Sequence, residues 1–418
     1  MNKPELLLPA SCPEVLRTAI RYGADAVYIG GELYGLRAKA KNFSNEDMAE
    51  SIRFAHEHGR KVYVTANITA HNRDLSGIKE YFRELSEIKP DALFISDPGV
   101  FELAGEYAPG IDRHISTQAN NTNWMTYKFW KERGATRVVS ARELSIDEIA
   151  EIRRNTPDGP EIETFVHGAM CISYSGRCLL SNYFTGRDAN LGACTHPCRW
   201  KYYLMEESRP GEYLPVFENE RGTYIFNSKD LCMIEHIPEL VNAGIDSFKI
   251  EGRMKTALYV ATVAGTYRKA IDDYFESPEK YIENLPLYRE NISKCTYRNF
   301  TTGFFFNKPG ADAQVYDNNV YVRDHIYYGM PGMISAKGEA VMEQKNKFSV
   351  GDILEVMHFD GTFSETEVLE IKDEDGNSMG SCPHARQKIY VRFSVMPQVG
   401  EILRGKGTED GGLDEGKE

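Results

Sequence analysis

The chain has 418 residues, of which 41% are hydrophobic and 27% charged, and its formal net charge at pH 7 is -13. This length suits one large domain and a smaller one, and the acidic balance argues against a surface coated for nucleic acid. No apolar run approaches the roughly 18 residues of a membrane span. The N-terminus has too early a proline for a signal peptide. We therefore expect a cytoplasmic protein with no membrane segment and with reduced thiols.

One pattern repeats along the first part of the chain: an amphipathic stretch, a glycine or small polar pair, then a short apolar run. Gly59 before KVYVTAN and Gly244 before SFKIEGR are examples, because glycine suits a helix end that reverses into a strand. Eight runs are candidate strands: Glu5–Ala10, Ala26–Gly30, Lys61–Asn67, Ala92–Asp97, His114–Ala119, Arg137–Arg142, Glu161–His167 and Ser247–Glu251.

Near-continuous apolar strands that alternate with helices indicate a parallel sheet covered by helices. Eight such units within about 275 residues predict an α/β fold, a TIM (β/α)8 barrel. The alternative is an open doubly wound sheet, which is less favoured because no glycine-rich phosphate fingerprint follows the first strand. The barrel is expected to span residues 1–275, with a cysteine loop at 168–230 emerging after the seventh strand.

Polar residues end several of these runs, and a barrel collects such residues at its C-terminal mouth, where the fold carries its chemistry. We predict His167, Glu251 and Asp97 to be catalytic, and Arg142, Arg253, Asn67 and Gln118 to bind substrate. Other interpretations stay open. Asp97 could equally cap the next helix, and a lone histidine is more often structural. Glu251 and Arg253 could pair with each other or clamp an anionic substrate.

The densest chemical signal is a C-x6-C-x15-C-x3-C array formed by four of the eight cysteines: Cys171, Cys178, Cys194 and Cys198. Four thiolates are typical of an iron–sulfur cluster and also of structural zinc. Only the second pair has the short spacing of a zinc knuckle, so the residues favour iron–sulfur without excluding zinc. A single cysteine nucleophile would leave three thiols unexplained. We interpret the other four cysteines as buried apolar groups.

The character of the chain changes after about residue 275. Residues 276–310 are charged and punctuated by proline, and we predict a linker. From 311 to 405, short alternating runs broken by glycine and aspartate indicate a small C-terminal β-barrel domain. Residues 406–418 are poor in apolar side chains and are predicted to be a disordered tail.

Two motifs, HGAMCISYSGRCLLS at 167–181 and FKIEGRMK at 248–255, resemble the signature of the collagenase-like peptidase family U32, over essentially the whole chain. Within that family, GRDANLGACTHPCRW at 186–200 and the terminal β domain resemble the branch that makes 5-hydroxyuridine at the tRNA wobble position. The resemblance implies an oxygen-independent hydroxylation with prephenate as co-substrate. It also implies a 4Fe-4S cluster held by the four cysteines of the array. In related ubiquinone-hydroxylating members the last ligand lies farther downstream, which makes Cys232 the alternative to Cys198.

Two functions from different classes follow. The first is an RNA-modifying enzyme whose partner is the tRNA anticodon loop, with unstacked bases held by aromatic rings and arginine. Candidates for those contacts are Tyr174, Tyr183, Phe184 and Arg177, although the aromatics could equally pack the loop. The second is a peptide hydrolase in which His167 and Glu251 activate water, yet neither an HExxH zinc site nor a GxSxG elbow is present. A scaffold whose metal only holds the loop is a third option.

Prephenate is a small dicarboxylate, and a partly buried carboxylate needs a cationic partner because leaving it unpaired would cost several kcal/mol. Arg142 and Arg253, both at predicted strand ends, are the expected partners. Lys249 is less favoured, since its side chain could point elsewhere on the same strand.

Overall fold

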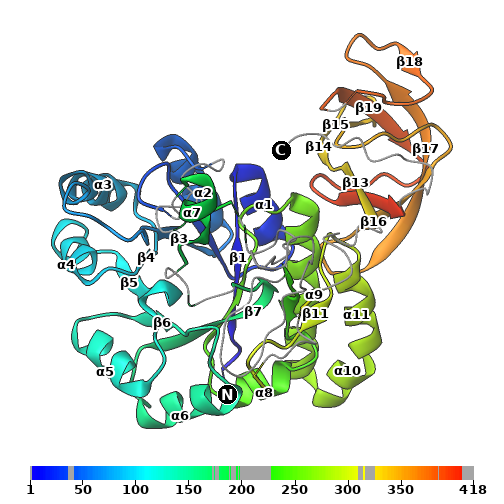
Figure 1. Ribbon diagram of the computed structural model, residues 1–418. Coiled ribbons are helices and arrows are strands. Elements are labelled where there is room, and N and C mark those ends of the chain that lie inside the picture. Colours follow the sequence, from blue (N-terminus) through cyan, green and yellow to red (C-terminus); the bar gives the residue numbers. More distant parts are fainter. Residues whose placement is uncertain are drawn as a thin grey trace, which may run out of the picture.

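The structure is a computed structural model that describes residues 2–35, 42–171, 174, 178–187, 189, 194–195, 197, 227–308, 314–315, 325–384 and 386–406. These residues form a large α/β body and a smaller all-β body (Figure 1). No helix in the described part of the chain is both long enough and apolar enough to cross a membrane. Arg177, Cys198 and the predicted tail beyond residue 406 lie outside the described residues.

Eight parallel strands close into a barrel, which confirms the predicted TIM fold. They are β1 (Glu5–Pro9), β2 (Ala26–Gly30), β3 (Lys61–Thr65), β4 (Ala92–Ile95), β5 (Asp112–Ile115), β6 (Arg137–Val139), β7 (Glu161–Ala169) and β10 (Ser247–Ile250). Each strand pairs with the next in order, and β10 pairs in parallel with both β1 and β7. This last pairing closes the barrel and excludes the open sheet.

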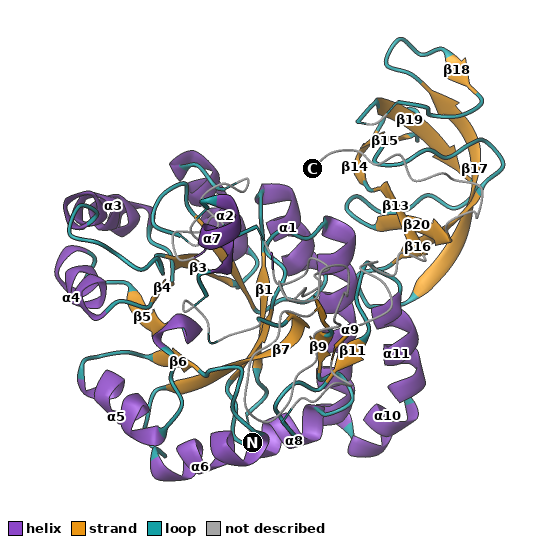
Figure 2. Cartoon of the chain, in the orientation of Figure 1, coloured by secondary structure: helices purple, strands orange, loops and turns teal. Residues whose placement is uncertain are grey.

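Helices surround the barrel, as Figure 2 shows in purple. They are α1 (Pro13–Arg21), α2 (Asn45–Glu57), α3 (Leu75–Ile88), α4 (Pro98–Tyr107), α5 (Trp124–Glu132), α6 (Ile146–Asn155), α8 (Ile237–Asn242) and α9 (Ala257–Glu276). Local sequence sets several helix ends. Ser145 and Glu148 form a capping box at the start of α6. Gly59 and Gly244 take positive φ angles of 66° and 77° after α2 and α8, which only glycine adopts without strain.

The fifth strand differs from the predicted run His114–Ala119. β5 ends at Ile115, and a 3-10 turn, η1 (Thr117–Ala119), follows it. The reason lies in the neighbouring ladder, because the short β6 pairs with β5 only at His114 and Ile115. Gln118 therefore lies on a turn above the strand end rather than on the strand itself.

Additional elements extend the sheet beside the barrel. The last residues of β7, His167–Ala169, pair in antiparallel fashion with β9 (Asp230–Cys232), which pairs with β11 (Phe300–Thr301). Within the predicted cysteine loop lies the short helix α7 (Leu180–Thr185). The segment treated as a linker contains the helices α10 (Pro278–Glu283) and α11 (Leu285–Ser293). β8 (Asn227–Ser228) pairs with β12 (Gln314–Val315).

The C-terminal body is an antiparallel sheet domain with its own hydrophobic cluster, in agreement with the predicted second domain. Its strands are β13 (His325–Gly329), β14 (Pro331–Ile334), β15 (Ala340–Glu343), β16 (Ile353–Met357), β17 (Phe363–Lys372), β18 (Ser378–Met379), β19 (Lys388–Phe393) and β20 (Ile402–Lys406). It packs on α1 and α9. The Tyr22 hydroxyl donates to the Met357 carbonyl at 2.7 Å and accepts from the Ile402 amide at 3.0 Å.

Candidate active site

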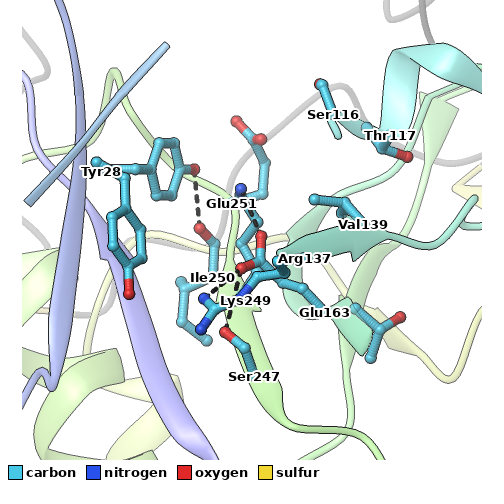
Figure 3. Close-up of polar contacts among 12 residues, drawn as sticks. Tyr28, Ser116, Thr117, Arg137, Val139, Glu163, Ser247, Lys249, Ile250 and Glu251 are labelled. Atoms are coloured by element: carbon cyan, nitrogen blue, oxygen red, sulfur yellow. Dashed lines mark hydrogen bonds and ion pairs between the residues drawn. The ribbon is translucent and has the colours of Figure 1, made fainter. Parts of the chain in front are cut away.

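The N-terminal half of the barrel interior is filled by charged side chains instead of the usual branched aliphatic layer. Arg137 donates to Glu5 and Glu163, and the Lys249 ammonium lies 2.7 Å from the Glu163 carboxylate. Figure 3 shows Arg137, Glu163, Ser247 and Lys249 meeting between the strands. Arg137 also pairs with Glu161 at 2.6 Å, so three carboxylates surround the two cations. This pairing is what allows charges to persist in a nearly dry interior.

Lys249 lies one layer higher on the inward face of β10 and is 5% exposed. Its Nζ lies 3.4 Å from the centroid of the Phe94 ring and 4.6 Å from that of Tyr28. Burial lowers the pKa of the Lys249 ammonium, although the neighbouring Glu163 carboxylate opposes that shift. The Lys249 side chain thus points into the barrel. Its direction could not be decided from the sequence.

At the C-terminal mouth, Arg142 connects the barrel to the cysteine loop. Its Nη2 lies 3.4 Å from Oε2 of Glu251, and its Nη1 lies 3.6 Å from the sulfur of Cys171. The guanidinium also stacks 3.9 Å above the centroid of the Phe165 ring. Both side chains of the ion pair are largely buried. The guanidinium thus lies between a carboxylate of the mouth and a thiol of the cysteine array.

Arg253 also lies at the mouth and is 5% exposed. Its guanidinium donates to the Thr65 hydroxyl at 3.0 Å and contacts the Asn42 side-chain oxygen at 3.4 Å. A Cβ atom on Gly30 would lie 2.5 Å from Nη1, so the missing side chain of Gly30 makes the space that Arg253 fills. The backbone of the barrel therefore fixes the position of this cation.

The remaining predicted mouth residues have distinct surroundings. The Asn67 amide donates to the Ser116 hydroxyl at 3.2 Å. Gln118 keeps its buried side-chain oxygen without a hydrogen-bond partner among the described residues. Asp97 accepts from the Val100 amide at 2.9 Å and caps α4, which is the structural role that the sequence left open for it.

His167 points away from the mouth, although it stands at the predicted strand end. Its ring packs among Tyr259, Tyr267 and Phe300, with centroid distances of 6.0, 5.6 and 5.7 Å. Burial lowers the pKa of His167 to about 3, so the imidazole is neutral at physiological pH. The Glu251 carboxylate, in contrast, faces Arg142. The backbones of His167 and Glu251 are joined by a hydrogen bond from the Glu251 amide to the His167 carbonyl.

Three cysteines of the array are described, and their thiols are accessible: Cys171 is exposed, while Cys178 and Cys194 are half-buried. The Thr195 amide donates to the Ser181 hydroxyl at 3.0 Å, which brings Cys194 beside the start of α7 and hence near Cys178. The described residues contain no group of three metal-binding side chains around one point. Accessible thiols, one of them beside Arg142, nonetheless suit a thiolate-bound metal.

Cys232 has a different environment. It pairs with His167 in the β7–β9 ladder, and its sulfur lies 4.0 Å from the Tyr267 hydroxyl. Burial raises the pKa of this thiol to about 12. Cys295 and Cys382 are buried in the cores as predicted, whereas Cys12 and Cys232 are only half-buried. Sequence reasoning missed the interior histidine, His114. The period-2 alternation of β5, which places His114 and Ser116 on one face, was the available signal.

The fold and this mouth define a class of protein. The model for peptidase family U32 matches residues 12–315, and the model for the peptidase family U32 C-terminal domain matches residues 323–404. The chain therefore belongs to peptidase family U32.

Individual relatives are similar over most of the chain. It is 42% identical to "tRNA hydroxylation protein P1" of Bacillus subtilis, covering 96% of this chain and 95% of that protein. It is 41% identical to "tRNA hydroxylation protein P" of Escherichia coli, covering 96% of each. A third relative, "23S rRNA 5-hydroxycytidine C2501 synthase" of Escherichia coli, is 35% identical over 77% of this chain and 48% of its own length.

Proposed function

We propose that this protein is an RNA-modifying enzyme that hydroxylates tRNA, and that its target is the wobble uridine, converted to 5-hydroxyuridine. The observation that carries the proposal is the near full-length similarity, at about 40% identity, to proteins named for tRNA hydroxylation. The relative named for 5-hydroxycytidine synthesis supports hydroxylation of a pyrimidine base in RNA.

The surface around the cysteine loop supports contact with unstacked bases. Tyr183 is 83% exposed and Phe184 is 42% exposed on α7, and their rings meet edge to face at 5.1 Å. An exposed aromatic pair is the kind of platform on which single-stranded bases stack. Tyr174, at 46% exposed, adds a third ring in the same loop. The acidic net charge of -13 disfavours phosphate contacts in general, but base stacking on these ring faces does not depend on it.

The proposed cofactor is a 4Fe-4S cluster with Cys171, Cys178, Cys194 and Cys198 as ligands, and Cys232 as the alternative to Cys198. When bound, such a cluster supplies electron transfer or Lewis acidity at the edge of the barrel mouth. The protein's own contribution is a nearby cation. Arg142 contacts both Cys171 and Glu251, so it places a positive charge between the cysteine loop and the mouth.

The proposed co-substrate is a small dicarboxylate, prephenate, bound by Arg142 and Arg253. A substrate carboxylate arriving at the mouth can compete with Glu251 for the Arg142 guanidinium. Arg253 is held from behind by Thr65 and Asn42, which orients its planar fork. Glu251, once released, can accept a proton at the mouth.

The competing function is peptide hydrolysis by His167 and Glu251. The two functional side chains face different surroundings, and the buried imidazole is packed among aromatic rings. Hydrolysis by this pair would require His167 and Glu251 to act together on one water molecule. This arrangement favours hydroxylation over hydrolysis.

The test is mass spectrometry of tRNA nucleosides from cells that lack the protein. Wild type should restore 5-hydroxyuridine, and supply of prephenate should be required. Alanine at any of the four array cysteines should abolish both the product and the visible absorption of anaerobically purified protein, whereas Cys295→Ala and Cys382→Ala should preserve both. If Cys232→Ala loses its iron while Cys198→Ala retains it, the fourth ligand is Cys232 and not Cys198. If wild type restores no hydroxyuridine and purified protein cleaves gelatin, the proposal is wrong.

A further inference from the structure

The interior of the barrel holds a lysine that no step above uses. Lys249 lies on β10 two residues before Glu251, which directly follows the strand, so strand alternation would bring both side chains to the inward face, about 7 Å apart. Fully charged pairs at the N-terminal end explain why Glu163 and Arg137 are buried. The Glu163 contact holds the Lys249 ammonium, which also faces the Phe94 and Tyr28 rings one layer below the mouth.

Three features of its environment are those of a nucleophilic amine. The ammonium is 5% exposed and lies against the Phe94 ring, and burial lowers its pKa. Glu163, at 2.7 Å, is a carboxylate able to exchange a proton with it. Arg137 donates to that same carboxylate, so a second cation disfavours the charged lysine.

A neutral histidine also packs against the Phe94 ring. His114 is 3% exposed, and its ring centroid lies 5.2 Å from that of Phe94. Its Nδ1 is buried without a hydrogen-bond partner among the described residues. Burial and the nearby cations Arg137 and Lys249 hold the pKa of His114 well below its ordinary value. A neutral imidazole with an unused nitrogen can carry a proton to or from a reacting oxygen.

The anion partner is within reach of the same cluster. The Arg142 guanidinium stacks 3.9 Å from the centroid of the Phe165 ring, and the Lys249 ammonium lies 5.5 Å from that centroid. One aromatic ring is thus flanked by an amine below and a guanidinium at the mouth. A ligand that spans them needs a carbonyl for the amine and a carboxylate for the guanidinium.

We infer that Lys249 is a Schiff-base lysine and that the barrel takes a 2-oxo carboxylate whose carboxylate pairs with Arg142. The ammonium and the ketone combine to give a protonated imine and one water molecule, so no net proton or electron is exchanged. The imine keeps the positive charge, and its pairing with Glu163 persists through the step. His114 moves the proton that converts the carbinolamine hydroxyl into water. This inference rests on the proposed function, because it names the group through which the co-substrate is held.

The experiment traps the imine. The full-length protein is incubated with pyruvate or phenylpyruvate, reduced with sodium borohydride and mapped by peptide mass spectrometry. The peptide containing Lys249 should carry the reduced adduct, and Lys249→Met should lose it. Lys255→Arg, which changes a second lysine of the same motif, should label like wild type. If wild-type protein is labelled only at other lysines, or is not labelled at all, the inference is wrong whatever the variants show.

Two further arms define the ligand and separate the two proposals. Acetone, a ketone without a carboxylate, should label Lys249 about ten-fold less than pyruvate, as should Arg142→Gln with pyruvate, a ratio that corresponds to about 1.4 kcal/mol. If acetone labels Lys249 as strongly as pyruvate does, the inferred pairing of a ligand carboxylate with Arg142 is wrong. If wild type makes hydroxyuridine but no adduct forms, the Schiff base is wrong and the hydroxylation stands. If the adduct forms but wild type makes no hydroxyuridine, the Schiff base stands and the hydroxylation is wrong.

Discussion

Replacing His114 with Phe should flatten the dependence of stability on pH. His114 is neutral in the folded barrel because burial and the cations Arg137 and Lys249 hold its pKa well below 6.5. In the unfolded chain it takes up a proton near pH 6.5. The unfolded state therefore binds more protons below that pH, and stability falls as the pH falls.

The magnitude follows from the unfolded pKa alone, provided that folded His114 stays neutral. Between about pH 7.5 and about pH 5.5, one such histidine lowers the free energy of unfolding by about 1.3 kcal/mol. Phenylalanine fills a similar ring-shaped space between Phe94 and Tyr63, which contact His114 edge to face. It has no proton to bind, so His114→Phe should lose this part of the pH dependence.

Urea unfolding at the two pH values, followed by circular dichroism, measures the effect. The matched control is His71→Gln, which alters an exposed histidine and should keep the wild-type difference between the two pH values. If His114→Phe and wild type lose the same free energy of unfolding on acidification, the assignment of a neutral buried imidazole is refuted. The same result would remove His114 as a proton carrier for Lys249.

Three further predictions concern the mouth, the interior and the surface. Arg253→Lys keeps the charge, but a single ammonium nitrogen cannot reach Thr65 and Asn42 as the planar guanidinium does. Thermal denaturation should therefore show about 1–2 kcal/mol of lost stability, and nucleoside analysis should show less hydroxyuridine. Unchanged hydroxyuridine would contradict a role for Arg253 in substrate binding. Glu163→Gln leaves two buried cations short of a carboxylate and should destabilise the barrel by about 3 kcal/mol in urea; a neutral effect would show the network to be dispensable. Tyr183→Ala should weaken tRNA binding about ten-fold in a filter assay without altering the melting temperature, and unchanged affinity would exclude stacking there.

Sequence reasoning identified the barrel because its signal is local and repeated. Each apolar run is long enough to be buried on both faces, and a glycine or polar break precedes it. β5 is the exception, since Asp112 and Arg113 begin the strand and a polar turn follows it. Which residues lie on β5 is decided by its pairing with β4 and β6, and a pattern within one segment does not contain that information.

The candidate site was predicted in part. Arg142, Glu251 and Cys171 do meet at the mouth, because each follows the C-terminal end of a barrel strand. His167 could not be oriented from the sequence. The β7–β10 register shifts between Lys249 and Ile250, and β9 joins the other edge of β7, so the side-chain alternation is interrupted just before the predicted catalytic position. Lys249 was less favoured in the sequence analysis because the inward direction of its side chain is set by closure of the barrel, which the pattern of one strand does not show.

The hydroxyl of Tyr22 has a consequence for how the two bodies melt. It is a phenol on a barrel helix, yet the groups that satisfy it, the Met357 carbonyl and the Ile402 amide, belong to the C-terminal sheet. The side chains of Met357 and Ile402 also belong to the barrel's own hydrophobic cluster. The end of one body is therefore part of the interior of the other. Heating should produce a single calorimetric transition in which the barrel and the sheet lose structure together, although they are formed by separate consecutive parts of the chain.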